Sequence, residues 1–485
     1  MTAALAGVLV YLACGVAGIL GAGRLTALVA IIGGWVSLLF WAPGFPVGVV
    51  GGPPWGIPVA GDTLALAFWA LAPLVHATAA WHERQRSTTF HGLVTLLVGT
   101  CLATVLSRDL FNLCVLLDLG SLLAVVLIGY DRKSAAVWAG FRYLLLSALA
   151  MLLYLLGVGL VYADLGTLSL VEIAEIGPSL SRPSLAVGAS LLVVGATVKA
   201  GIFLVGLWLP GAYRVAPVGV VTVLAGLVGK TGIVALARLS TALPVGPAVA
   251  VLGVITGFGG LIYALWERDL MRFLAYSILS QYGYMLVGFG LRGAAFTGAI
   301  YYTLAHCLFK GLLFYAAGSA IEGVGIHGIP ELARRLPRSA AWGLAVGAWS
   351  IAGLPPLAGF VAKEFLGSLV PPPYAWALTL LGVGTAASFS KVLPLLRPAS
   401  QHGEWGGVIL LTVGVVGFSV WGLASLPGLL SAITWAKAAA AVVAGFGLYF
   451  VVRRARVPLP EVRMHHMSVA MIVATVVLAM VHLAR

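Results

Sequence analysis

Apolar runs long enough to cross a lipid bilayer recur along this whole 485-residue sequence. A helix needs about 20 apolar residues to span the hydrocarbon core. Hydrophobic residues make up 61% of the chain and charged residues only 9%, whereas soluble domains carry about 25% charged residues. The sequence therefore predicts an all-α polytopic membrane protein. Its apolar runs divide into about sixteen spans, over residues 2–20, 25–41, 62–81, 89–106, 110–129, 135–163, 184–206, 213–238, 247–266, 273–290, 294–320, 340–370, 375–396, 406–424, 428–452 and 467–484.

The formal charge of +13 does not indicate a nucleic-acid partner, because the basic residues lie between spans rather than in one patch. Basic residues accumulate in cytoplasmic loops. One set of alternate loops holds Arg24, Arg84, Arg86, Arg132, Lys133, Arg214, Arg268, Arg272, Arg334, Arg335, Arg338, Arg397, Arg453, Arg454, Arg456 and Arg463. The other set holds Arg108, Arg182, Arg238 and Arg292. This bias predicts a multi-pass protein of the cell membrane with its N-terminus outside the cytoplasm.

The cysteines do not indicate a metal or iron–sulfur site. Cys14, Cys101, Cys114 and Cys307 all fall within predicted spans and form no CxxC pair, which is the spacing that zinc and iron–sulfur sites require. No glycine-rich motif follows a predicted strand, and no Walker loop ending in Lys-Ser/Thr occurs either. We therefore expect no cofactor bound by this chain.

Proline interrupts the helical pattern at membrane depth in two places. Pro210 lies in the WLPG segment at 208–211, and Pro355 and Pro356 lie in GLPP at 353–356. Proline removes a backbone donor and breaks the helix. In lipid, such a break is tolerated where it lines a hydrated cavity, and paired broken helices indicate inverted repeats. Two ordinary loops remain the alternative reading.

Charged residues also lie inside the predicted spans, mostly between residues 89 and 370. Each costs at least about 2.5–3.5 kcal/mol at the bilayer centre and usually marks an ion pathway. A buried ion pair that only fixes helix packing, or a snorkelling lysine, is the structural alternative. We expect snorkelling for Arg142 and a helix-end position for Lys391. The candidates for function are Asp118, Lys199, Lys230, His306, Lys310 and Lys363.

Lysine is suited to carrying protons in this setting. Burial lowers the pKa of a lysine from about 10.4 toward physiological pH, and a neighbouring carboxylate opposes that shift. If Asp118 and Lys199 are neighbours, moving the carboxylate away would discharge the lysine and moving it back would recharge it. A series of such groups joined by water would form a proton relay.

Several ordered motifs run from about residue 61 to residue 363. They are DLFNL at 109–113 with Asp118, KAGIF at 199–203, WLP at 208–210 with Tyr213 and AP at 216–217, GKTG at 229–232, FLAYS at 273–277, SQYGY at 280–284, HCLFK at 306–310, and GLPPLAGF at 353–360 with Lys363. Together they resemble the antiporter-type membrane subunit family, which comprises the D subunit of Mrp sodium/proton antiporters, the proton-pumping subunits of complex I and membrane-bound hydrogenase relatives. The D subunit of Mrp antiporters is the most similar in motif.

The resemblance implies a fold and roles for these residues. It implies about fourteen core helices with two inverted five-helix repeats, each containing one broken helix. Together with our count of about sixteen spans, this gives an expected 14–16 transmembrane helices. Asp118 and Lys199 would be the gating pair, Lys363 the terminal lysine, and the central relay would be Lys230, His306 and Lys310. We divide the chain into N-terminal helices (1–88), first repeat (89–238), second repeat (239–400) and C-terminal helices (401–485).

Three departures from the family pattern stand out. Asp118 replaces the usual glutamate, and its side chain is shorter by one methylene, so the pair must approach more closely or be bridged by water. Gly211 replaces an acidic residue, and the apolar segment 218–223 replaces a small, polar one. The C-terminal helices exceed the family core by about two, and they offer a docking surface for a partner.

The leading functional hypothesis is a proton-translocating subunit of a multi-subunit cation (Na+)/proton antiporter. Its partners would be other membrane subunits, protons, possible Na+ and lipid. The alternative is the same module in a redox-driven complex, of the complex I or membrane-bound hydrogenase type. A third hypothesis is a scaffold with a vestigial relay. The chain is not expected to be catalytic by itself.

Overall fold

The computed structural model describes residues 2–40, 45–52, 56–176, 182–203, 205–333, 335–397, 403–455 and 464–483. Three of the basic residues used for the topology prediction, Arg334, Arg456 and Arg463, lie outside these ranges. The first half contains α1 (Thr2–Ile19), α2 (Leu25–Leu39), α3 (Thr63–His82), α4 (Thr88–Leu106), α5 (Leu110–Ile128), α6 (Ser134–Leu165), α7 (Leu170–Ile176), α8 (Pro183–Ala200), α9 (Leu209–Val215), α10 (Val218–Val223), the π-helical turn η2 (Leu224–Val228) and α11 (Gly229–Ala242).

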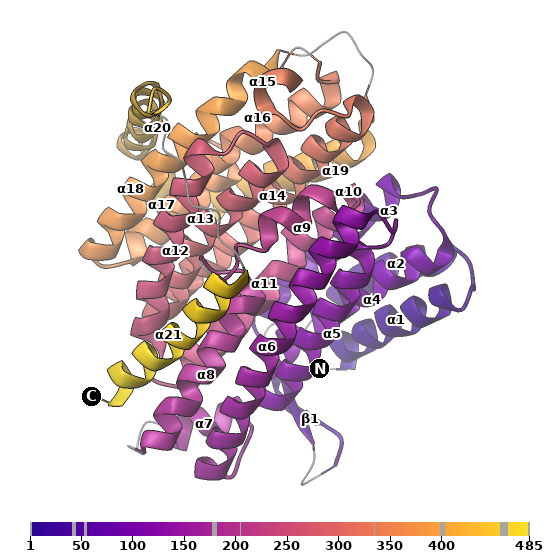
Figure 1. Ribbon diagram of the computed structural model, residues 1–485, viewed down its shortest axis with the longest axis vertical. Coiled ribbons are helices and arrows are strands. Elements are labelled where there is room, and N and C mark those ends of the chain that lie inside the picture. The colour runs from indigo at the N-terminus through magenta and orange to yellow at the C-terminus, as the bar shows by residue number, and fades with distance from the viewer. Residues whose placement is uncertain are drawn as a thin grey trace.

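The second half continues as a bundle of helices that pack side by side with the first (Figure 1). It contains α12 (Gly246–Trp266), α13 (Leu270–Leu291), α14 (Gly293–Val324), α15 (Ile329–Leu332), α16 (Arg338–Ala352), α17 (Ala358–Leu369), α18 (Pro372–Phe389), the 3-10 turns η3 (Ser390–Leu396) and η4 (Pro427–Leu430), α19 (Gly406–Ser425), α20 (Ala432–Val452) and α21 (Met464–Leu483).

Twelve helices in the described part of the chain are long and apolar enough to cross a membrane. Two further apolar helices, Leu25–Leu39 and His466–Met480, are shorter. Many large apolar side chains on the outside of the bundle are exposed, such as Leu152, Val413 and Val443, as expected where lipid replaces water around the protein. These features confirm the prediction of an all-α polytopic membrane protein.

A short antiparallel hairpin, which the sequence did not predict, follows α2. Its strands are β1 (Phe45–Val50) and β2 (Ile57–Gly61). Val59 of β2 also pairs with Ser107, at the junction of α4 and α5. Asp62 then begins α3, where its Oδ1 accepts a hydrogen bond of 2.9 Å from the backbone N–H of Ala65. The hairpin marks one end of the molecule, called here the hairpin end.

Two halves of the bundle repeat one local design. Asp109, which precedes α5, forms an isolated antiparallel β-bridge with Ser169. Asp269, which precedes α13, forms the same kind of bridge with Gly328. Each aspartate also caps the helix that it precedes, by accepting a hydrogen bond from a backbone N–H three residues later. The bridges join α5 to the segment before α7, and α13 to the segment before α15.

The two copies of this design lie at opposite ends of the molecule. Figure 1 shows α7 at the hairpin end and α15 at the far end. In both copies a 32-residue helix, α6 or α14, leads to the bridge and ends at a glycine in the left-handed conformation, with φ of 71° at Gly166 and 75° at Gly325. This is the arrangement that two inverted repeats produce.

Each copy also contains one broken helix, in agreement with the predicted fold class. α8 stops at Gly201 (φ 72°) and α16 stops at Gly353 (φ 87°). The predicted span 184–206 is therefore too long, because the first helix ends at Ala200 and the chain leaves helical geometry before the proline. Pro210 lies in the first turn of α9, where its missing N–H costs nothing.

The second break also divides a predicted span. The predicted span 340–370 is two helices, α16 and α17, and Pro355 and Pro356 lie between them. Neither proline donates a backbone hydrogen bond, so the helix cannot continue through this pair.

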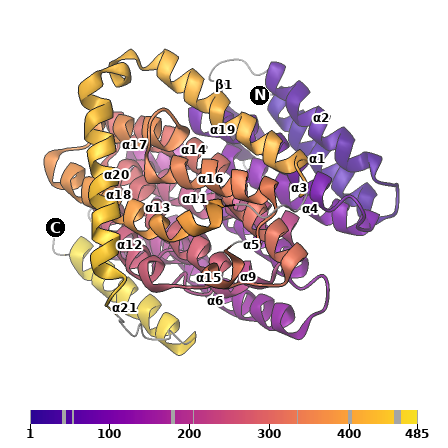
Figure 2. The same cartoon turned by 90° about the horizontal axis from the view of Figure 1, so that it is seen from above.

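The C-terminal helices lie at the edge of the bundle. α19 packs on α3 and α14, α20 on α18, and α21 on α8. Figure 2 shows α20 and α21 along one side of the molecule. α20 is mostly exposed in the isolated chain, because only 17% of the residues in its apolar stretch are buried. Most of its surface therefore faces lipid or another protein.

Glycine allows α8 and α11 to approach closely near the centre of the bundle. A Cβ placed on Gly232 of α11 would lie 2.3 Å from the backbone N of Ala200 and 2.7 Å from the carbonyl carbon of Lys199. Backbone atoms cannot move aside as a flexible side chain can. Gly232 therefore sets the position of the end of α8.

We predict that Gly232→Ala lowers the apparent melting temperature of the purified protein in detergent. Overpacking of this kind costs about 1–3 kcal/mol. Gly211→Ala is the matched control, because a Cβ there meets no atom within 4 Å. Equal melting temperatures for the two variants would contradict the proposed close contact.

Candidate functional site

Lys199 forms a polar site near the middle of the bundle. Its side chain is 2% exposed. The ammonium group donates hydrogen bonds to Asp118 Oδ1 at 3.2 Å, to Ser121 Oγ at 2.8 Å and to Ser147 Oγ. The partners come from α5 and α6. The shorter carboxylate of Asp118 therefore reaches Lys199 directly, without the water bridge that the sequence left open.

The side chain of Asp118 is also partly exposed on the outside of the bundle. Its side chain is 44% exposed in this chain, and its neighbours on α5, Val115, Leu119 and Leu122, are exposed apolar residues. The carboxylate thus lies on a lipid- or protein-facing surface while it contacts a buried lysine. A charge at membrane depth requires a polar partner or water, so this face is suited to contact with another polar membrane subunit.

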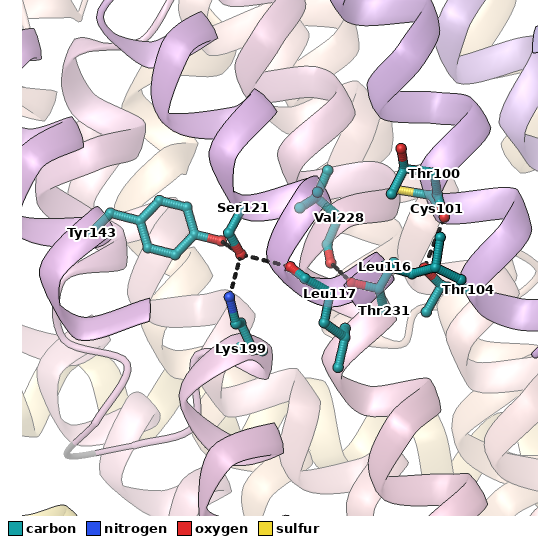
Figure 3. Close-up of a pocket in the computed structure, with 11 residues that line it drawn as sticks. Thr100, Cys101, Thr104, Leu116, Leu117, Ser121, Tyr143, Lys199, Val228 and Thr231 are labelled. Atoms are coloured by element: carbon teal, nitrogen blue, oxygen red, sulfur yellow. Dashed lines mark hydrogen bonds between the residues drawn. The ribbon is translucent and has the colours of Figure 1, made fainter. Parts of the chain in front are cut away.

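A small cavity of about 10 Å³ adjoins Lys199 (Figure 3). Its polar lining is Thr100, Thr104, Ser121, Tyr143, Lys199 and Thr231. In Figure 3 the Ser121 hydroxyl lies between Lys199 and the Tyr143 ring, and the Tyr143 hydroxyl donates to Ser121 Oγ at 3.1 Å. A polar cavity of this size holds about one water molecule.

Lys230 lies in the first turn of α11. The π-helical turn η2 directly precedes it, and the Lys230 ammonium donates to the carbonyl of Ala225 within that turn. A π-helical turn shifts the backbone hydrogen-bond register and often occurs at functional sites. The turn therefore supplies a backbone acceptor to a lysine that is fully buried.

Tyr282 lies against Gly229, the neighbour of Lys230, and against the ring of His306. A Cβ on Gly229, the residue before Lys230, would lie 2.2 Å from the Tyr282 hydroxyl. The rings of Tyr282 and His306 have centroids 5.6 Å apart. Neither the Tyr282 hydroxyl nor either ring nitrogen of His306 has a hydrogen-bond partner among the described residues. Buried polar atoms of this kind are usually satisfied by water.

His306 and Lys310 lie one turn apart on α14 and are both fully buried. Lys310 donates to the carbonyl of Leu274 at 3.0 Å and to the hydroxyl of Ser277. His306 interacts electrostatically with both Lys230 and Lys310. The three groups therefore form one cluster between α11, α13 and α14.

Lys363 lies beside the second break. Its ammonium donates to the carbonyl of Ile351, at the end of α16, at 2.7 Å, and lies 5.6 Å from the centroid of the Tyr284 ring. Tyr284 stacks on Tyr302 with centroids 4.7 Å apart, and the Tyr302 hydroxyl donates to Gln281 Oε1. Tyr284 and Gln281 belong to α13 and Tyr302 belongs to α14, so this polar and aromatic group joins the two helices beside Lys363.

The structure thus places the predicted residues in three groups: Asp118 with Lys199, Lys230 with His306 and Lys310, and Lys363 alone. Among the described residues, only Asp118 and Lys199 form an ion pair within the set. Lys391 donates to the carbonyls of Ala264 and Glu267 at the end of α12, in agreement with its predicted helix-end position.

Sequence reasoning missed the hydroxyl groups that complete these sites. Ser121 lies three residues after Asp118, so that helical periodicity places both on one face, and this spacing was an available signal. Ser147, Tyr143 and Tyr282 had no comparable signal, because their contacts depend on how the helices pack.

The fold and site define a class of polytopic membrane protein with paired broken helices and intramembrane lysines. The family described as "NADH:quinone oxidoreductase/Mrp antiporter, TM" matches residues 107–388. The chain is 34% identical over 366 residues to the N subunit of the NADH-quinone oxidoreductase of Desulforudis audaxviator, covering 70% of this chain and 73% of that protein. It is 29% identical over 357 residues to the D subunit of the Na+/H+ antiporter of Alkalihalophilus pseudofirmus, covering 70% and 72%.

Two solved structures share the fold. One belongs to the membrane-bound sulfane sulfur reductase, an archaeal respiratory complex, with a TM-score of 0.79, 20% identity, and coverage of 93% of this chain and 99% of that chain. The other belongs to the Mrp complex of Dietzia sp. DQ12-45-1b, with a TM-score of 0.72, 21% identity, and coverage of 93% and 98%. The chain belongs to the NADH:quinone oxidoreductase/Mrp antiporter family of membrane subunits.

Proposed function

We propose that this chain is the proton-translocating subunit of a multi-subunit cation (Na+)/proton antiporter of the cell membrane. The observation that carries the proposal is the contact between Asp118 and the buried Lys199. A buried lysine held by a carboxylate and by hydroxyls gains or loses a proton according to the position of that carboxylate. A helix break and a polar cavity lie directly beside it.

The other predicted residues extend this site across the bundle. Lys230, His306 and Lys310 form the central relay, with the Tyr282 hydroxyl beside Lys230, and Lys363 is the terminal lysine at the second break. The lysines other than Lys199 rest on carbonyl or hydroxyl acceptors rather than on carboxylates. At Lys230 and Lys310 these neutral acceptors do not stabilise the ammonium form as a carboxylate would, whereas Lys363 also interacts electrostatically with Glu364, the next residue.

The half-exposed carboxylate of Asp118 supports the presence of membrane partners. The solved structures of similar fold are both parts of multi-subunit complexes. We expect a polar group of a neighbouring subunit to lie against Asp118, and the N-terminus to lie outside the cytoplasm. Arg108 and Arg238, which belong to the smaller set of loop basic residues, both pair with Asp62 at the hairpin end, as expected if their loops share one side of the membrane.

A redox-driven complex is the second candidate. The 34% identity to the N subunit of an NADH-quinone oxidoreductase and the similarity to the sulfane sulfur reductase complex favour it. The same residues would then couple proton movement to electron transfer in other subunits. Purification of the intact complex, followed by mass spectrometry of its subunits, separates the two: iron–sulfur or nickel–iron proteins select the redox complex.

We predict that Lys199→Ala reduces proton translocation by the intact complex to the level of membrane vesicles that lack this chain. The substitution removes the ammonium group that exchanges protons with Asp118. Translocation is measured as quenching of a pH-sensitive dye after energisation. Lys133→Ala, outside the site, is the control. Normal translocation by Lys199→Ala at a normal assembly level would contradict the proposal and support a scaffold role.

We predict that Tyr282→Phe slows translocation without lowering the amount of assembled complex. The change removes only the hydroxyl beside Lys230, and an unpartnered buried hydroxyl contributes little to stability. Tyr11→Phe is the matched control, because its buried hydroxyl also has no partner among the described residues but lies on α1. Equal rates for both variants would remove Tyr282 from the relay.

A further inference from the structure

A stripe of buried polar residues runs from the Lys199 cavity toward the hairpin end. On α4 it consists of Thr100 and Thr104, one helical turn apart, and on α11 it consists of Thr231 and Arg238, two turns apart; Arg108 follows the end of α4 at Leu106. Spacings of four and seven residues place side chains on one helix face. None of these residues belongs to the relay described above.

The stripe ends in a cluster of two arginines around one carboxylate. Arg238 donates to both oxygens of Asp62, at 2.5 and 3.0 Å, and Nη2 of Arg108 lies 3.2 Å from Asp62 Oδ2. Both guanidinium groups also donate to the carbonyl of Val105, at 3.1 and 3.2 Å. Val105 directly follows Thr104 in the sequence, so the cluster lies directly beyond the hydroxyl stripe.

The cluster carries one excess positive charge. Burial raises the pKa of Asp62, but the charge and hydrogen bonds of Arg238 and the charge of Arg108 together lower it to about 2. Asp62 is therefore ionised at neutral pH, and the two arginines outnumber it. Its side chain is 39% exposed, whereas those of both arginines are buried. The carboxylate thus connects the cluster to the surface at the hairpin end.

A cavity lies at the Lys199 end of the stripe, and one buried donor without an acceptor among the described residues lies in the cluster at its other end. The cavity beside Lys199 is lined by Thr100, Thr104 and Thr231, and Thr104 precedes Val105, whose carbonyl both arginines bond. The buried Nε of Arg238 has no acceptor among the described residues. A buried donor of this kind is usually satisfied by water, and the cavity is large and polar enough for about one water molecule.

We propose that this stripe is a proton route between Lys199 and the hairpin end, and that the Arg108–Asp62–Arg238 cluster is the barrier that closes it. The proposal rests on the proposed function. In the step, the Lys199 ammonium gives a proton to a water in the cavity and becomes a neutral amine, and the proton passes along hydroxyls and water to solvent. A fixed guanidinium repels an approaching proton, and Asp62 holds both guanidinium groups in the path.

The barrier role makes the charge of Arg238, rather than its packing, the property that matters. Membranes containing the whole complex are given a pH gradient without an energy source, and its decay is followed. Arg238→Gln removes one positive charge and is expected to speed the decay severalfold. Arg238→Lys keeps the charge and is expected to remain as tight as the wild type. Arg182→Gln is the matched control, since Arg182 pairs with Asp164 away from the stripe.

A double variant tests whether the route passes through Lys199. Arg238→Gln combined with Lys199→Ala is expected to be tight again. A leak that persists in the double variant, or equal leaks in Arg238→Gln and Arg238→Lys, would overturn the proposal, and so would a tight Arg238→Gln variant at normal assembly. None of these results changes the outcome expected for Lys199→Ala alone, so the proposed function and the barrier fail separately.

Thr104→Val keeps the test decisive if Arg238→Gln does not assemble. Valine has nearly the shape of threonine and lacks the hydroxyl, so it leaves the barrier intact and interrupts the stripe. We expect slower energised translocation with no added leak. An unchanged translocation rate would overturn the route.

Discussion

The need to pair every backbone carbonyl and every charge inside lipid governs this structure. A break or distortion in a helix frees carbonyl groups, which have no water to bond at membrane depth. Here lysines approach several of these sites: Lys230 bonds Ala225 in the π-helical turn, and Lys363 bonds Ile351 at the end of α16. One contact thus satisfies both the irregular backbone and the buried ammonium group. At these two places the irregular backbone and the buried lysine therefore stabilise each other.

Lys199 is the exception, because its acceptors are side chains. It bonds a carboxylate and two serine hydroxyls, and its own helix stops at Gly201, two residues later. A side-chain acceptor can move away, whereas a backbone carbonyl within a packed helix cannot. The exposed position of Asp118 also places this acceptor where a neighbouring subunit can attract it. The carboxylate–lysine pair is therefore the one group of the three that includes a half-exposed charge.

The two ends of the bundle are built differently although the halves repeat one design. At the hairpin end Asp62 is shared by Arg108 and Arg238. At the far end Asp269 pairs with Arg214, which lies on the short helix after the first break. An inverted repeat exposes equivalent sites to opposite sides of the membrane. Different charge clusters therefore distinguish the two ends of a chain whose halves repeat one design.

The sequence by itself determined the membrane class, the helix breaks and the intramembrane lysines, but it assigned Arg108 and Arg238, which the structure buries, to loops. These features are local: the length of an apolar run, a proline within it, or a lysine such as Lys230 flanked by apolar residues is visible in a short window. Predicted span ends were less accurate, because α8 ends at Ala200, before the left-handed Gly201, whereas the predicted span ran to residue 206. The hairpin over residues 45–61 was missed because it is short and rich in glycine and proline.

Only the tertiary structure decided which of these groups meet. Asp118 and Lys199 are 81 residues apart, Ser147 and Lys199 are 52 apart, and Asp62 and Arg238 are 176 apart. Contacts of that separation depend on how helices pack, and no local pattern carries that information. Helix packing also assigned Lys391 to the end of α12 and brought Tyr282 next to Lys230. The sequence thus named most of the charges, and the fold arranged them into a carboxylate–lysine pair, a central cluster and an arginine–aspartate cluster at the hairpin end.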